Sequence, residues 1–145
     1  MAEAEKKTRA QKKAETSARM LSVARRNFHE HGFAATSMDE LCAEAGVTRG
    51  ALYHNFGSKE GLFEAVVRQI DAEMGDRILA AGSEARSSLP EFINACLTYL
   101  ELALDSEVRR IVLQDAPAVL GQRLRDIAAE GSLGSQAEEL KELMR

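Results

Sequence analysis

The spacing of the apolar residues is the feature that most limits what this 145-residue chain can fold into. One row recurs every three or four residues and so lies on one face of an α-helix: Phe63, Val67, Ile70, Met74 and Ile78. Valine and isoleucine elsewhere keep this helical spacing instead of the alternation that is typical of a strand, and only two prolines interrupt the chain. The sequence therefore predicts an all-α fold, long enough to bury a core in one or two units.

Helix caps and glycines divide the first half of the chain into short elements. Ser37 opens a capping box with Glu40, and Thr48 and Ser58 can cap the two helices that follow. Glycines stand just past three of the expected helix ends: Gly32, Gly46 and Gly57. The expected helices cover residues 15–31, 38–45, 48–56 and 58–81.

These elements divide the chain into an arm, a head and a body. Residues 1–14 are basic and lack an apolar row, so we expect a disordered arm there. Residues 15–62 form the head, and the long helix joins it to a helical body, residues 63–145. Residues 81–88 are rich in small side chains and lack periodicity, which indicates a linker.

Two apolar rows run along the helix that follows Pro90, a residue suited to a first helical turn. The rows are Phe92, Cys96, Tyr99, Ala103 and Ile93, Leu97, Leu100, Leu104. We therefore expect a core helix of the body, buried on most sides. Ser106 can cap a further helix, which Pro117 interrupts; residues 119–129 resume it, and a second capping box at residues 135–138 begins a last helix.

The chain has a formal net charge of -4, but its charged residues are distributed unevenly along the sequence. Residues 1–68 hold 11 Lys and Arg against 9 Asp and Glu, whereas residues 69–145 hold 8 against 14. A basic front end and an acidic back end suggest a head that binds a polyanion and a body that does not. A solvated charged tail on an ordinary helix would give the same charge pattern.

The helices of residues 38–45 and 48–56, joined by a turn with a glycine, have the spacing of a helix-turn-helix unit, whose second helix can enter the major groove of DNA. Arg49, Tyr53 and His54 offer donors to base edges and phosphates, and Gly50 lets the helix approach closely. Residues at helix starts can bind phosphate together with the free amides: Lys59, Thr36 and Ser37. A short capped helix with one apolar face is also common in all-α domains that bind no DNA.

The stretch GVTRGALYHNFGSKEGLF, residues 46–63, with Gly32-Phe33 and Thr36-Ser37 upstream, resembles the TetR family of bacterial transcription regulators. The resemblance runs from about Ala18 to Ala65 and implies a dimeric repressor that binds half-sites of a palindromic double-stranded DNA operator. It also implies a body pocket for a small-molecule effector that releases the DNA. By position, the implied DNA contacts are Thr36, Thr48, Arg49, Tyr53, His54 and Lys59, and the implied head core is Phe28, Leu41, Val47, Leu52 and Phe56.

The body is less specific in sequence. Family members usually continue through two more long helices that form the dimer interface, whereas this chain ends at Arg145, so we expect a shortened body. Polar groups that can line an effector pocket are Asn94, Thr98, Tyr99, Arg110 and Gln114. The alternative is a DNA-binding protein of the same fold without an effector pocket, whose body serves only for assembly.

Other classes of function find little support. His29 and His31 are two residues apart and point in different directions on a helix, so we expect no metal, no cofactor and no enzyme. No apolar run of 18 residues exists and the start is charged, which argues against a membrane or secretion. Cys42 and Cys96 lack metal-ligand spacing and fit a reducing, cytoplasmic setting.

Overall fold

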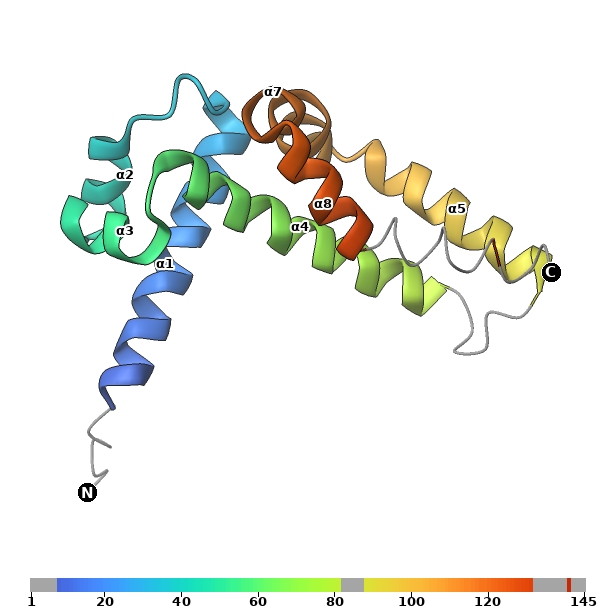
Figure 1. Cartoon of the computed structure of the whole chain (residues 1–145), viewed down its shortest axis with the longest axis horizontal. Coiled ribbons are helices and arrows are strands. Elements are labelled where there is room, and N and C mark those ends of the chain that lie inside the picture. Colours follow the sequence, from blue (N-terminus) through green and yellow to red (C-terminus); the bar gives the residue numbers. More distant parts are fainter. Residues whose placement is uncertain (1–7, 82–87, 132–140, 142–145) are drawn as a thin grey trace. The chain divides into compact units, whose positions relative to one another are not determined.

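The computed structural model describes residues 8–81, 88–131 and 141, and every regular element in that part of the chain is a helix (Figure 1). The all-α prediction is confirmed. The elements are α1 (Arg9–His31), α2 (Met38–Ala45), α3 (Arg49–Phe56), α4 (Lys59–Ala81), α5 (Leu89–Ala103), α6 (Ser106–Val108), the π-helical segment η1 (Arg109–Asp115), α7 (Ala116–Leu120) and α8 (Gln122–Glu130). The chain forms two compact units, residues 1–63 and 64–145, so α4 contributes to both.

The core of the first unit is built around three phenylalanine rings. The Phe63 ring lies edge-on to the rings of Phe28 and Phe33, with centroids 5.0 Å apart in both pairs. Such pairs add a specific geometry to the burial of apolar area. Besides Phe28 and Phe63, the buried apolar side chains of this unit are Met20, Ala24, Leu41, Cys42, Ala45, Leu52 and Leu62, while Phe33 is half-buried. Of the expected head core, Phe28, Leu41 and Leu52 are buried, whereas Val47 and Phe56 are only half-buried.

The predicted N-cap hydroxyls are in place, and of the capping box expected between Ser37 and Glu40 the structure gives the serine half. The Ser37 Oγ accepts from the Glu40 amide at 3.4 Å, and the Thr48 Oγ1 accepts from the Ala51 amide at 3.1 Å. The Ser58 Oγ accepts from the Gly61 amide at 2.9 Å at the start of α4. These bonds satisfy amides that have no partner within their own helices, so the sequence fixes where each helix begins.

The start of α1 corrects the prediction. The helix begins at Arg9, six residues before the expected Glu15, so residues 9–14 are helical instead of part of a disordered arm. Thr8 and Gln11 form a full capping box there, with the Gln11 side chain accepting from the Thr8 amide at 2.7 Å. The pattern of apolar residues does not predict this first turn, because its side chains are exposed and it is defined by the capping box alone. Residues 1–7 lie outside the described ranges.

In the second unit, the row on α4 is buried as predicted: Val67, Ile70, Met74 and Ile78 are each at most 5% exposed. On α5 the prediction of a helix buried on most sides is wrong. Only Ala95 and Leu102 are buried, and one of the two apolar rows is exposed: Ile93, Leu97, Leu100 and Leu104. Among the described residues no element covers that row.

The remaining helices differ from the expectation in their caps. Asp105, not Ser106, caps α6, its Oδ1 accepting from the amides of Glu107 and Val108 at 2.9 and 3.2 Å. Pro117 lies in the first turn of α7, and the break comes at Gly121, whose φ of 53° suits glycine. The expected linker (except its flanking Ala81 and Ser88) and the helix expected from residue 135 lie outside the described residues.

Candidate functional site

The turn between α2 and α3 fixes the geometry of the helix-turn-helix unit. Gly46 adopts the left-handed conformation (φ 65°, ψ 39°) that closes α2, and the Val47 amide then donates to the Cys42 carbonyl at 3.0 Å. Thr48 follows as the cap of α3. Two helices of eight residues are thus joined by three residues, and Leu52, fully buried, fixes which face of α3 is turned inward.

The opposite face of α3 carries the side chains that the sequence assigned to DNA. Arg49, Tyr53 and His54 are all exposed, and their spacing places them on one side of the helix. Gly50 is on the same side, where a Cβ atom would have only the Thr48 Oγ1 within 4 Å, at 3.9 Å. The surface of α3 at Gly50 is therefore open, as a close approach to a groove requires.

Arg49 is held by two neighbours. Its Nη1 lies 3.3 Å from the Oδ1 of Asp39 on α2, and its guanidinium carbon lies 6.0 Å from the centroid of the Tyr53 ring. A hydrogen bond with the Tyr53 side chain, followed by the charge of Asp39, raises the pKa of Arg49. Asp39 was not among the residues selected from the sequence, since nothing in its spacing relates it to a residue ten positions later.

The helix-start residues fall into two groups. Lys59 opens α4 with its Nζ 4.5 Å from the centroid of the Phe33 ring, and Ser37 and Thr48 have hydroxyl groups that accept from backbone amides. Each of these hydroxyls keeps a proton that can be donated to a phosphate oxygen. Thr36 is different: it is 4% exposed and its Oγ1 donates to the Gly32 carbonyl at 2.8 Å. Its predicted side-chain contact with DNA is therefore corrected to a structural role at the end of α1.

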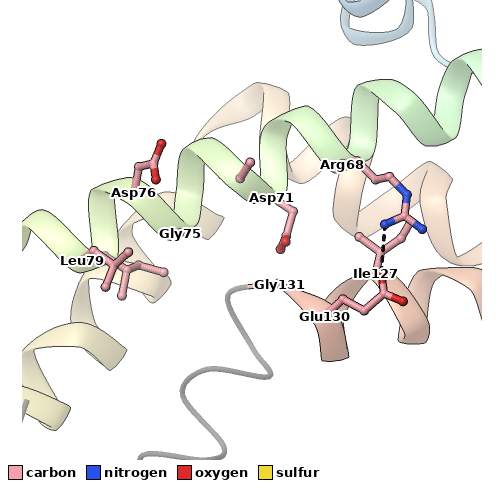
Figure 2. Close-up of a pocket in the computed structure, with 10 residues that line it drawn as sticks. Arg68, Asp71, Gly75, Asp76, Leu79, Ile127, Glu130 and Gly131 are labelled. Carbon is pink, nitrogen blue, oxygen red and sulfur yellow. Dashed lines mark hydrogen bonds and ion pairs between the residues drawn. The ribbon is translucent and has the colours of Figure 1, made fainter.

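The second unit contains a cavity of about 410 Å³ between α4 and α8, shown in Figure 2. Charged and apolar side chains are mixed along its wall: Figure 2 shows Arg68 and Glu130 beside Ile127 at one end and Asp76 beside Leu79 at the other. The cavity is lined by Arg68, Asp71, Ala72, Gly75, Asp76, Ile78, Leu79, Ile127, Glu130 and Gly131. Arg68 is bound on both sides, with its Nη1 3.1 Å from Glu130 and its Nε 3.1 Å from Glu64. These two bonds raise the pKa of Arg68, the one with Glu130 contributing most.

None of the five residues predicted to bind an effector lines this cavity. The Asn94 side chain donates to the Ala81 carbonyl at 2.6 Å, Arg110 pairs with Asp115, and Gln114 is exposed. Thr98 lines a second cavity, of about 340 Å³, and Tyr99 is half-buried, with a pKa raised by burial and then by the charge of Asp71. The five groups do not meet at this cavity, because Asn94, Thr98 and Tyr99 lie on α5 whereas Arg110 and Gln114 lie on η1. Their binding of an effector stays a prediction.

Comparison with known proteins agrees with this arrangement. The family model for bacterial regulatory proteins of the tetR family matches residues 20–66, and that for a tetracyclin repressor-like C-terminal domain matches residues 89–145. The crystal structure of a TetR-family transcriptional regulator from Pectobacterium atrosepticum is 46% identical and superposes with a TM-score of 0.69 over 91% of this chain and 82% of that one. The chain belongs to the TetR family.

Relatives within the TetR family carry regulatory names. The transcriptional regulator TtgR of Pseudomonas putida is 35% identical over 103 residues, 67% of this chain. The transcriptional repressor AcnR of Corynebacterium efficiens is 40% identical over 63 residues, 43% of this chain. The chain spans less than half of these curated relatives, 47% and 34% of their lengths.

The TetR family is one of DNA-binding transcriptional regulators. The first family model covers all but the first two residues of the predicted resemblance and includes all eight residues assigned to DNA. No helix within residues 8–81 and 88–131 is long and apolar enough to cross a membrane. The same ranges hold no group of three or more His, Cys, Asp or Glu side chains that is placed to bind a metal ion.

Proposed function

We propose that this chain is a sequence-specific repressor of transcription that reads an operator through α3. The observation that carries the proposal is the exposed face of α3, where Arg49, Tyr53 and His54 lie beside the open surface at Gly50, after a glycine turn. A recognition helix needs such a face, with donors for base edges and no bulky side chain at the point of approach. The names of TtgR and AcnR support this function.

In this proposal the contacts divide by chemistry. Arg49 and His54 bind base edges and so choose the sequence, whereas Ser37, Thr48, Tyr53 and Lys59 bind phosphates and set the register of the head on the duplex. Lys59 supplies an ion pair beside the free amides of the first turn of α4. The DNA lies in the cytoplasm, where we propose that the protein acts.

We further propose that two copies bind a palindromic operator as a homodimer, as is typical of the family. Helix-turn-helix dimers read half-sites about one helical turn of DNA apart, roughly 34 Å, or a multiple of it. Selection of duplexes from a random-sequence library by the full chain tests both statements. We expect an inverted repeat with that spacing and a dimer in sedimentation; enrichment of no sequence contradicts the proposal, and a monomer that selects a single half-site contradicts the dimer alone.

The cavity between α4 and α8 is our candidate for the effector site. It is large enough for a small molecule and combines apolar walls with a few charged groups, as ligand sites do. Because α4 belongs to both units, a ligand that binds one arrangement of α4 more tightly shifts the head as well. A coupling of about 1–3 kcal/mol weakens DNA binding roughly 5- to 150-fold.

One observation favours the alternative without a sensor: the five polar groups expected to bind an effector do not converge on the cavity. Reciprocity separates the two functions, because a coupled ligand must bind more weakly when operator DNA is present, by the same factor. A ligand found by thermal-shift screening is titrated with and without the selected duplex. Unequal affinities support effector control, and equal affinities favour the sensorless function.

A further inference from the structure

A carboxylate faces the proposed reading residue of α3. Asp39, in the first turn of α2, is 3.3 Å from the Nη1 of Arg49, and both side chains are well exposed, 72% and 58%. The Tyr53 ring, one turn further along α3, has its centroid 6.0 Å from the guanidinium carbon. Two residues, Asp39 of α2 and Tyr53 of α3, therefore hold the Arg49 head group before any DNA is bound.

This contact contributes little to the stability of the fold. Exposed ion pairs add about 0–1 kcal/mol at most, because water screens both charges. Two other acids, Glu40 and Glu44, are also on α2, while α3 begins with Arg49. A negative charge beside the proposed base-reading arginine weakens the attraction of this surface for every phosphate. A role for Asp39 therefore concerns which acceptor on DNA the Arg49 guanidinium binds.

A guanidinium has five N–H donors in a planar fork. Asp39 occupies the Nη1 side of that fork, which leaves donors for a second, bidentate partner. On DNA the candidates are the O6 and N7 acceptors of guanine, which are neutral, and the phosphate oxygens, which are charged. The Asp39 carboxylate repels a phosphate that approaches the shared guanidinium but has little effect on a neutral base edge.

We propose that Asp39 is a positioning residue for sequence discrimination: it holds the Arg49 guanidinium against Tyr53 and directs it to a base edge instead of a phosphate. The proposal rests on the function proposed above. Without the Asp39 carboxylate, the Arg49 side chain can adopt more conformations, and a DNA phosphate can approach it without repulsion. The variant then binds unrelated DNA better and distinguishes the operator less well.

The test compares Asp39→Asn with Glu40→Gln in the full chain. Glu40 is the adjacent residue of the same helix turn, so its change removes the same charge from the same helix end but leaves the contact with Arg49 in place. Two probes are used: a duplex that the wild-type chain selects from a random-sequence library, and a scrambled duplex of the same base composition. Affinities are measured at several salt concentrations, together with the melting temperature of each variant.

For Asp39→Asn we expect the ratio of the two affinities to fall about two- to fivefold, the range that an exposed ion pair supplies. On the scrambled duplex the salt slope should steepen by about 0.9, for one added phosphate contact. Glu40→Gln should raise both affinities by one common factor. Asp39→Glu, which restores a carboxylate, should recover most of the ratio, and in an Arg49→Ala background Asp39→Asn should leave the ratio unchanged.

Equal ratios and slopes for Asp39→Asn and Glu40→Gln overturn this inference and leave the proposed function intact. The inference is also overturned if Asp39→Asn lowers the affinity ratio in the Arg49→Ala background as much as it does in the wild-type chain, since Asp39 then acts without Arg49. Failure of the wild-type chain to select any duplex is a different result: it overturns the proposed function and this inference with it.

Discussion

At the scale of single residues, Lys59 has two contacts that one variant can distinguish. One is the proposed ion pair with a DNA phosphate, and the other is the contact of its Nζ with the Phe33 ring. Replacement by alanine removes one ion pair, so the salt slope of DNA binding should fall by about 0.9. It also removes the cation–π contact with Phe33, which costs about 0.5–1 kcal/mol of stability. Titrations at several salt concentrations and a melting curve measure the two effects.

Two variants serve as controls for Lys59. Lys59→Arg keeps the charge and should keep the slope, and Tyr53→Phe, which removes a neutral donor, should weaken binding with nearly the same slope. An unchanged affinity and slope for Lys59→Ala would show that this residue has only the structural contact.

Gly61 has a structural constraint that the sequence does not reveal. A Cβ atom at this position would overlap the carbonyl oxygen of Phe56, the last residue of α3. Gly61→Ala should therefore force α3 and α4 apart and cost about 1–3 kcal/mol of unfolding free energy. Gly50→Ala is the matched control, because its Cβ meets ordinary space and alanine favours a helix. Urea denaturation measures both; equal stabilities would contradict the close approach at Gly61.

What a sequence predicts at this scale depends on distance along the chain. Gly46 and Gly57 stand just past helix ends, so their positive φ angles of 65° and 78° follow from local pattern. The contact of Asp39 with Arg49 joins residues of two helices, and the burial of the Thr36 hydroxyl depends on the fold of the turn before α2. The spacing of residues along the sequence does not predict contacts of this kind.

At the scale of elements, α5 shows that an apolar pattern predicts a helix better than it predicts burial. Both of its apolar rows repeat at helical spacing, but which row is covered depends on the elements that pack against it. The exposed row reaches 76% exposure at Leu104, whereas Leu102, two residues before it, is 4% exposed. The helix α1 shows the converse, since its first turn is set by a capping box without any apolar face.

This difference along α5 gives a direct prediction. Leu102→Ala removes a buried side chain and should lower the unfolding free energy by about 2–4 kcal/mol. Leu97→Ala makes the same chemical change on the exposed row and should cost no more than about 0.5 kcal/mol. Chemical denaturation of the two variants, compared with the unchanged chain, measures the difference. Equal losses would mean that the exposed row is covered in solution.

At the scale of the whole molecule, the all-α architecture was predictable because helical periodicity and caps are local properties. The resemblance in residues 18–65 then identified the family, and the division after residue 63 lies one residue from the expected boundary of the head. The cavity was not predictable, because α4 and α8 are far apart in sequence and their polar residues follow no motif.

The central claim is that α3 reads a DNA sequence, and the ratio of two affinities tests it most directly. The full chain is titrated at one salt concentration against the duplex that it selects and against a scrambled duplex of equal composition. We predict that the selected duplex binds at least about 1,000-fold more tightly. Arg49→Ala should lower that ratio roughly 5- to 150-fold, the discrimination of one bidentate base contact. Equal affinity for both duplexes, or a ratio unchanged by Arg49→Ala, would contradict the account.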